Sequence, residues 1–204
     1  FCSNLESIIG KTHINTVIVT SIGELLGGIK GWVTDFVVKK IKRMVPKYHL
    51  LNTVNFSHAL TEGKKFKLRN FQNGPSDVIV HQYTGGTTGV SKGAMLTNEN
   101  LVANMLQIRS WMQNYLVEGK EITLSPLPMY HIFAFSVNCL AMLSYGAHTI
   151  LVTNARDINT VIKEFKQNRI SLMTGINTLF NALLNNEAFE KLDFSSLKIT
   201  VGGG

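Results

Sequence analysis

The part of the sequence with the clearest chemistry is residues 83 to 93, which read Tyr83-Thr84-Gly85-Gly86-Thr87-Thr88-Gly89-Val90-Ser91-Lys92-Gly93. Four glycines, three threonines, one serine and one lysine stand within this stretch. Glycines allow successive backbone N–H groups to converge on one point, because no Cβ blocks their approach. Hydroxyl groups add donors, and the lysine adds a positive charge. The composition indicates a phosphate-binding loop, with a flexible surface turn as the alternative interpretation.

Two common phosphate loops do not fit this stretch. The Walker A loop needs Gly-x-x-x-x-Gly-Lys-Ser/Thr, whereas Lys92 is preceded by Ser91 and followed by Gly93. The dinucleotide fingerprint needs Gly-x-Gly-x-x-Gly, which residues 85–89 do not match. Both loop types are therefore excluded by residue order, and a P-loop hydrolase is not favoured.

Strand-like and helix-like patterns alternate along the chain on both sides of the glycine-rich stretch. A buried strand is expected at 16–20. Residues 47–76 show weak periodicity, and the cluster at 73–77 is expected to be a loop or linker. The strand at 121–124 breaks at Ser125-Pro126-Leu127-Pro128. Asn98 is the expected helix N-cap. Further strands are expected at 78–83, 93–97, 148–152, 170–174 and 197–201, and helices at 1–12, 29–45, 98–115, 132–143, 157–167 and 176–184. This alternation predicts an α/β layered domain with a largely parallel sheet that binds ligands at the carboxyl ends of its strands.

The net charge and the two cysteines bear on the partners and on the cellular compartment that the sequence predicts. Twenty Lys and Arg against thirteen Asp and Glu give a net charge of +7. No aromatic-interleaved basic tract or DNA-binding motif is visible, so nucleic acid is not an expected partner. Cys2 and Cys139 have no metal-ligand spacing, which favours reduced thiols and a cytoplasmic protein. Because the chain begins at Phe1 rather than Met, we expect a segment of something longer.

The helix expected from Ile29 to Val45 is basic and amphipathic. Its apolar stripe includes Trp32 and Phe36, and its other positions carry four lysines and an arginine up to Pro46. Such a helix can lie on an anionic membrane, here the inner face of the cell membrane, or it can pack its stripe on the protein core. The sequence leaves both interpretations open.

Three motifs, in the same order, resemble those of the adenylate-forming enzymes. Tyr83 to Gly93 resembles the family's Thr/Ser-Gly-rich-Lys-Gly signature, although Gly85 stands where many relatives carry serine. Pro126 to Phe133 resembles its aromatic-histidine motif, and Val201-Gly202-Gly203-Gly204 resembles the start of its adenine-binding motif. The stretches at 174–186, 193–197 and 36–48 are similar to bacterial long-chain fatty acid–CoA ligases. The resemblance therefore covers nearly the whole chain.

The resemblance implies a fold and an activity. Residues 1–204 would form part of the large N-terminal AMP-binding domain, without the small C-terminal domain. A long-chain fatty acid would react with ATP and Mg²⁺ to give an acyl-adenylate and pyrophosphate, and CoA would then form the thioester and release AMP. The family's magnesium-binding glutamate, ribose-binding aspartate and C-terminal lysine would lie beyond Gly204, so we expect these residues alone to be inactive. The alternatives are a fatty acyl-AMP ligase, another adenylation domain, or a non-catalytic membrane-surface fragment. The oligomeric state is left open, with a homodimer as one option.

The resemblance also implies roles for individual residues. Lys92 would be catalytic, and the Thr84 hydroxyl would approach Mg²⁺. His131 would position the acyl carboxylate and the α-phosphate, although a histidine among aromatic residues is more often a core side chain. Gly175 would line the acyl tunnel, or simply form a tight turn. The nucleotide would be held by Thr84, Gly85, Gly86, Thr87, Thr88, Gly89 and Lys92 at its phosphates and by Gly202, Gly203 and Gly204 at its adenine.

Overall fold

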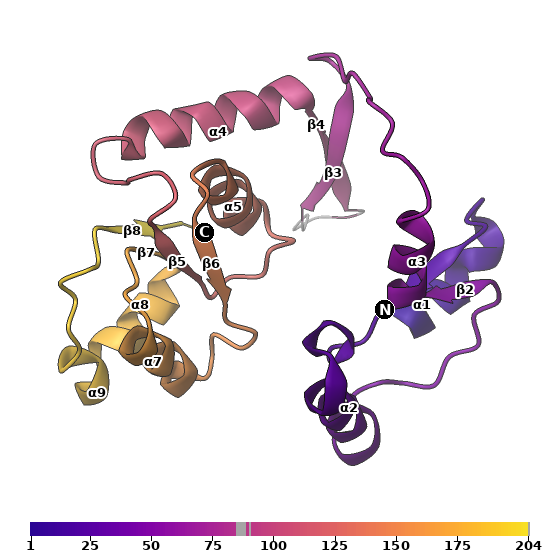
Figure 1. Ribbon diagram of the computed structural model, residues 1–204, viewed down its shortest axis with the longest axis horizontal. Helices are drawn as coiled ribbons and strands as arrows, with labels where there is room; N and C mark the ends of the chain where they lie inside the picture. Colours follow the sequence, from indigo (N-terminus) through magenta and orange to yellow (C-terminus); the bar gives the residue numbers. More distant parts are fainter. Residues whose placement is uncertain (85–88, 90, 204) are drawn as a thin grey trace. The chain divides into compact units, whose positions relative to one another are not determined.

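The structure is a computed structural model that describes residues 1–84, 89 and 91–203. The chain forms two compact units, Phe1–Phe71 and Gln72–Gly204. Each unit is described by itself (Figure 1).

The second unit is built on a four-stranded sheet. Its strands are β5 (Ile122–Ser125), β6 (His148–Leu151), β7 (Leu172–Gly175) and β8 (Ile199–Gly202). They lie in the order β6-β5-β7-β8, and every neighbouring pair is parallel. The α/β fold with a largely parallel sheet, predicted from the alternating patterns, is therefore confirmed.

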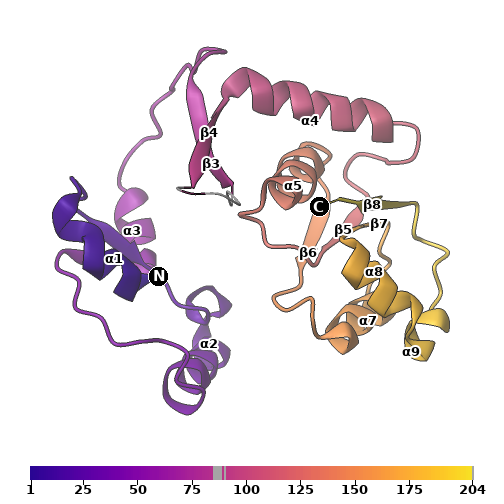
Figure 2. The same cartoon turned by 180° about the vertical axis from the view of Figure 1, so that it is seen from behind.

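Helices cover both faces of this sheet (Figures 1 and 2). Consecutive residues of a strand point to opposite faces, and Leu172 and Met173 accordingly belong to different cores. Met173 packs with α7 (Ile158–Gln167) and α8 (Asn177–Leu184), which the short α9 (Glu187–Glu190) follows. Leu172 packs with α4 (Asn98–Met112) and with one continuous helix formed by α5 (Ile132–Ala134), the π-helical segment η4 (Phe135–Ala141) and α6 (Met142–Ser144). The second unit is thus a three-layer α/β/α arrangement.

A hairpin precedes the sheet in the sequence. Strands β3 (Val78–Thr84) and β4 (Lys92–Thr97) pair antiparallel, and α4 begins immediately after β4. The N-cap of α4 is Thr97 rather than Asn98, because the Thr97 hydroxyl accepts the Asn100 N–H and the Asn100 side chain accepts the Thr97 N–H. This reciprocal capping box uses two backbone donors that a helix start leaves free.

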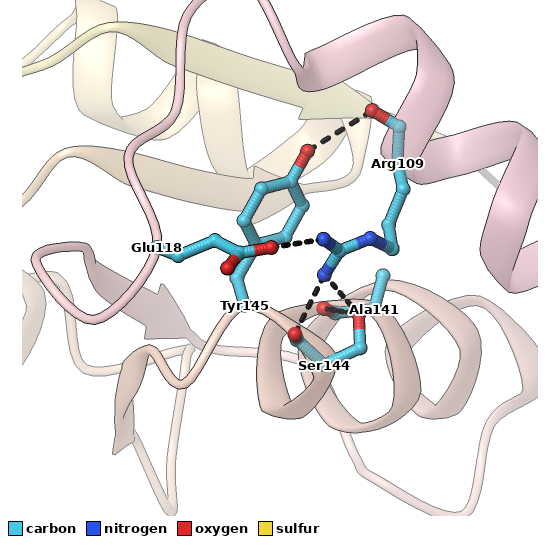
Figure 3. Close-up of polar contacts among 5 residues, drawn as sticks. All are labelled: Arg109, Glu118, Ala141, Ser144 and Tyr145. Atoms are coloured by element: carbon cyan, nitrogen blue, oxygen red, sulfur yellow. Dashed lines mark hydrogen bonds and ion pairs between the residues drawn. The ribbon is translucent and has the colours of Figure 1, made fainter.

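Dense polar contacts hold the amino edge of the sheet, where the strands begin. The Arg109 guanidinium at the end of α4 donates to the Ser144 carbonyl oxygen at 2.6 Å, contacts Glu118, and lies 4.3 Å from the centre of the Tyr145 ring (Figure 3). The Tyr145 hydroxyl donates to the Arg109 carbonyl oxygen at 3.0 Å. These contacts fasten α4 to α6, two elements that are far apart in the sequence.

A buried ion pair lies at the same edge. The Glu121 carboxylate precedes β5 and is fully buried, and Lys198, which precedes β8, donates to it at 2.6 Å. The Val117 N–H also donates to this carboxylate at 2.6 Å. Glu121 and Lys198 thus tie the start of β5 to the start of β8, which lies two positions away in the sheet.

The first unit is smaller and more open. It contains α1 (Cys2–Ile8), η1 (Ile9–Lys11), β1 (Val17–Val19), η2 (Glu24–Leu26), α2 (Gly28–Phe36), the π-helical segment η3 (Val37–Ile41), β2 (Thr53–Asn55) and α3 (Phe56–Gly63). The loop predicted at 73–77 is confirmed, since no helix or strand covers these residues. The weakly periodic residues before it contain β2, which pairs with β1 in parallel, and α3. The predicted strand at 16–20 exists, but Ile18 is 56% exposed, so its predicted burial was wrong.

The basic amphipathic segment forms a shorter helix than predicted. The helix ends at Ile41, before Pro46, because Arg43 adopts a positive φ of 47° that breaks the helical path. Trp32 is 67% exposed and stacks on Phe36 with ring centres 5.6 Å apart. The apolar stripe is therefore not buried within the described chain. No helix of the described residues has the length and apolar character needed to cross a membrane.

Candidate functional site

The sequence-predicted residues Gly175, Gly202 and Gly203 meet at the carboxyl edge of the sheet. Gly175 ends β7 and Gly202 ends β8, and the two are paired in register. The chain then continues to Gly203, whose N–H donates to the Gly175 carbonyl oxygen at 3.2 Å. Ser125 ends β5 and leads into the aromatic-histidine motif at the same edge. Two of the three motifs thus lie at the same edge of the sheet, at the ends of β5 and β8, which β7 separates.

Two aromatic rings lie against the glycines of this edge. A Cβ placed on Gly175 would lie 2.8 Å from Cζ of Phe180, and one placed on Gly203 would lie 3.1 Å from Cζ of Phe133. A side chain at Gly175 would force the Phe180 ring to shift, since real Cβ atoms do not come within 3.0 Å of a neighbour. A side chain at Gly203 would require the Phe133 ring to move by only a few tenths of an ångström. Both rings thus pack against glycines, and Phe180 occupies the space that the missing side chain of Gly175 leaves.

His131 is exposed and begins the helix that covers this edge. It is the N-cap of α5, and its Nδ1 accepts the Phe133 N–H at 3.3 Å. An accepting Nδ1 leaves the ring proton of the neutral imidazole on Nε2, which can then donate to a ligand. The interpretation of His131 as a core side chain is thus wrong, and its placement at a ligand-accessible edge agrees with a positioning role.

An open groove lies beside His131. Its volume is about 550 Å³, and it runs along the carboxyl ends of β5 and β6. Its lining is mainly apolar, with polar groups from Ser125, Thr153, Asn154 and Arg156. The groove gives the carboxyl edge the concave shape that small-molecule sites have.

Lys92 and Thr84 face each other at the end of the hairpin where the chain passes from β3 to β4. They are paired in register across β3 and β4, and the Thr84 hydroxyl donates to the Lys92 carbonyl oxygen at 3.4 Å. Both side chains are exposed. Gly89 has a φ of 152°, a conformation that residues with side chains rarely adopt. The other predicted loop residues, Gly85, Gly86, Thr87 and Thr88, and also Gly204, lie outside the described residues.

No group of three or more His, Cys, Asp or Glu side chains that could hold a metal occurs within the described residues.

Three residues of the site were not found from the sequence. Phe133 and Phe180 were read as members of apolar helices, because nothing local shows which glycine an aromatic ring will contact. Asn138, in the helix that begins at His131, is fully buried, and its side chain accepts a hydrogen bond from Thr174, the residue before Gly175. The sequence feature that could have identified Asn138 is a polar asparagine within an apolar helical stretch.

Comparisons with known proteins agree with this arrangement. The chain is similar to a long-chain-fatty-acid–CoA ligase of Escherichia coli O6:H1, with 47% identity over the whole chain and 36% of that protein. It is also 45% identical to the ligase of the same name from Haemophilus influenzae, again over the whole chain and 37% of that protein. The chain thus spans about a third of the length of these relatives.

A solved structure shows the same fold. The inhibitor-bound N-terminal domain of FACL13 from Mycobacterium tuberculosis matches 98% of this chain and 47% of its own, with a TM-score of 0.66 and 18% identity. Residues 5–204 match the family of AMP-binding enzymes. A match over nearly all of the chain, with the glycines and the histidine motif of that family at one sheet edge, shows that this chain belongs to the AMP-binding enzyme family.

Proposed function

We propose that the full-length protein is a long-chain fatty acid–CoA ligase that forms AMP. The observation that carries this proposal is the 47% identity to a ligase of that name, unbroken over all 204 residues. In the first half-reaction the fatty carboxylate attacks the α-phosphate of ATP and displaces pyrophosphate. In the second, the CoA thiol attacks the acyl carbonyl and displaces AMP. Neither step needs a nucleophile from the protein, so positioning and charge stabilisation are its tasks.

The hairpin loop between β3 and β4 is proposed to hold the ATP phosphates. Lys92 supplies the positive charge, and Thr84 and residues 85–89 supply hydroxyl and backbone donors. The exposed Lys92 and Thr84, paired across the hairpin, support this role. When bound, Mg²⁺ offsets phosphate charge, and Thr84 is the proposed protein ligand in this chain. Gly202, Gly203 and Gly204 are proposed to pass beside the adenine.

His131 is proposed to orient the acyl carboxylate against the α-phosphate. Its exposed ring, which has Nδ1 occupied as an acceptor, leaves Nε2–H as the donor toward an anionic oxygen. The adjacent groove of about 550 Å³ offers room for the reacting groups.

The acyl chain is proposed to enter past Gly175 and Phe180. An apolar cavity of about 390 Å³ lies between the sheet and α8, and the Phe180 ring lines it. The other lining residues include Phe165, Met173, Leu183 and Leu197. The ring contacts Gly175 on one side and borders this cavity, so it is placed to gate the passage of a chain.

Product analysis of the full-length protein tests the proposed function. With palmitate, ATP and Mg²⁺ we expect pyrophosphate release, and with CoA added we expect palmitoyl-CoA and AMP. Acyl-adenylate that forms but is not transferred to CoA would indicate a fatty acyl-AMP ligase or a carrier-loading enzyme instead. No fatty-acid-dependent pyrophosphate release would overturn the proposal.

We also propose that the basic segment around α2 and η3 contacts an anionic membrane surface from the cytoplasmic side. Support comes from the exposed, stacked Trp32 and Phe36 and from the neighbouring Lys30, Lys39 and Lys40. Sedimentation of the full-length protein with phosphatidylglycerol vesicles, but not with phosphatidylcholine vesicles, is the expected result, and equal sedimentation would contradict it.

A homodimer is the remaining proposal about partners. The mass of the full-length protein in solution, measured by light scattering, distinguishes a dimer from a monomer.

A further inference from the structure

A buried polar cluster lies beneath the helix that begins at His131. Asn138 is fully buried in the π-helical segment η4, among apolar neighbours. The Thr174 hydroxyl donates to its side-chain oxygen at 2.9 Å, and the Thr149 hydroxyl donates to its backbone carbonyl at 3.3 Å. Thr149 lies on β6 and Thr174 on β7. One asparagine therefore ties the helix to both strands that flank β5.

This arrangement is not the most stable one available to a core. The Asn138 Nδ2 atom has no hydrogen-bond partner among the described residues, and neither has the buried Thr123 hydroxyl on β5. A buried polar atom without a partner destabilises a fold, whereas an apolar side chain of the same shape can be neutral or stabilising. A leucine at position 138 would hold the helix on the sheet by packing alone, but it would not select one position along the strands.

The position of this helix decides where the site residues lie. Asn138 follows His131 by seven residues, or about two helical turns. Phe133, in the first turn, packs against Gly203 at the end of β8. Thr174, the partner of Asn138, immediately precedes Gly175. A small shift of the helix would therefore move His131 and Phe133 relative to the strand ends, and small displacements of positioning groups lower rates severely.

We infer that Asn138 is a positioning residue for acyl-adenylate formation, which acts by fixing the helix that carries His131 over the carboxyl edge of the sheet. The inference rests on the proposed function, because it assigns Asn138 to the adenylation step. It differs from a purely structural role in one respect: the effect of Asn138 on the reaction must pass through His131.

A double-mutant cycle in the full-length protein tests this inference. The measurement is palmitate-dependent ATP–pyrophosphate exchange for wild type, Asn138→Leu, His131→Ala and the double variant. We expect Asn138→Leu to lower kcat roughly tenfold or more in the wild-type background. In the His131→Ala background we expect a loss of less than about twofold, since the group being positioned is gone. The KM for ATP should hardly change, because the phosphates are assigned to the hairpin.

Equal losses in both backgrounds, or a rise in KM for ATP without a fall in kcat, would overturn the inference. Wild-type protein without exchange would overturn the proposed function as well, so the two failures are distinguishable. If Asn138→Leu does not fold, Thr174→Val takes its place in the cycle, because it removes the donor to Asn138 without changing the shape. Thr123→Val is the matched control, since it removes a buried hydroxyl that has no partner in the described chain, and exchange should be unchanged.

Discussion

The two edges of the four-stranded sheet are built in opposite ways. At the amino edge, charged and aromatic side chains make several contacts: Glu121 with Lys198, and Arg109 with Ser144 and Tyr145. At the carboxyl edge, β7 and β8 end in glycines, and the histidine that follows β5 is exposed. We therefore propose that the amino edge stabilises this unit and that the carboxyl edge holds the groups that act on the substrates.

The charge states of Glu121 and Tyr145 agree with a stabilising role for the contacts at the amino edge. Burial raises the pKa of the Glu121 carboxyl, but hydrogen bonds from Lys198 and from the Val117 N–H lower it by more, so the net pKa lies below the ordinary 4.5. The group is thus charged in the folded protein at neutral pH and held by its partners. Burial likewise raises the pKa of the Tyr145 phenol, which stays neutral and donates to the Arg109 carbonyl.

The largest expected effect separates two histidines. His131 follows β5 at the carboxyl edge, and His148 begins β6 at the amino edge. We expect His131→Ala to lower ATP–pyrophosphate exchange by about 100-fold, the typical loss when one positioned donor is removed. His148→Ala should leave exchange within about twofold and the melting temperature unchanged. His131→Ala should lower the melting temperature slightly, because it removes the side-chain acceptor of the Phe133 N–H at the start of α5. A similar loss of exchange in both variants would contradict the proposed difference between the two edges.

At the amino edge, Lys198→Met should act on stability and not on chemistry. It leaves the buried Glu121 carboxylate without its cation, and because Lys198 is 38% exposed the expected loss in free energy of unfolding is moderate, about 2 kcal/mol. Urea unfolding of the full-length protein measures it. Exchange under native conditions should stay within about twofold. A large loss of exchange in protein that is still folded would contradict the division of roles.

Arg109→Met should have a smaller effect of the same kind. The substitution keeps much of the aliphatic packing but removes the hydrogen bond to the Ser144 carbonyl and the contact with the Tyr145 ring. We expect a loss of about 1 kcal/mol, because the Glu118 partner is largely exposed and contributes little. The midpoint of urea unfolding measures this loss. An unchanged midpoint would show that the contacts of Arg109 with Ser144 and Tyr145 do not stabilise the fold.

The smallest expected effect is a change in pH dependence. A carboxyl with a lowered folded-state pKa contributes stability above its unfolded value, and this stability is lost as pH falls through the folded value. The contribution of Glu121 is therefore present above pH 4.5 and disappears at more acidic pH. Glu121→Gln should make the urea midpoint fall less between about pH 6 and about pH 3.5 than in wild type. An unaltered slope would show that Glu121 is not linked to folding.

The sequence predicted the second unit well because short apolar runs alternate there with helices that show a clear period. The strands at 121–124, 148–152, 170–174 and 197–201 all appear within two residues of their predicted ends. The first unit was predicted less well. A three-residue strand such as β2 has too few residues to show a pattern, and its partner β1 lies 36 residues earlier, as Val17 pairs with Thr53. No local pattern predicts the pairing of β1 with β2, because it joins residues that are far apart in the sequence.

The candidate site shows the same difference between residues that a local pattern identifies and residues whose contacts are long-range. The glycines, Lys92 and His131 were found because their residue types carry chemistry in a short pattern. Phe133, Phe180 and Asn138 were missed because their contacts join residues far apart in the sequence, such as Asn138 with Thr174. Local patterns also could not distinguish Thr97 from Asn98 as the helix cap, since both side chains can accept a backbone N–H and only the geometry decides.

The most direct test of the account is ATP–pyrophosphate exchange by the full-length Lys92→Ala variant, measured together with its melting temperature. Lys92 is exposed at the start of β4 and makes no ion pair with any described residue, so its removal should not affect folding. We predict that exchange falls by about 100-fold or more while the melting temperature stays the same. Exchange at the wild-type rate would contradict the claim that this loop holds the ATP phosphates.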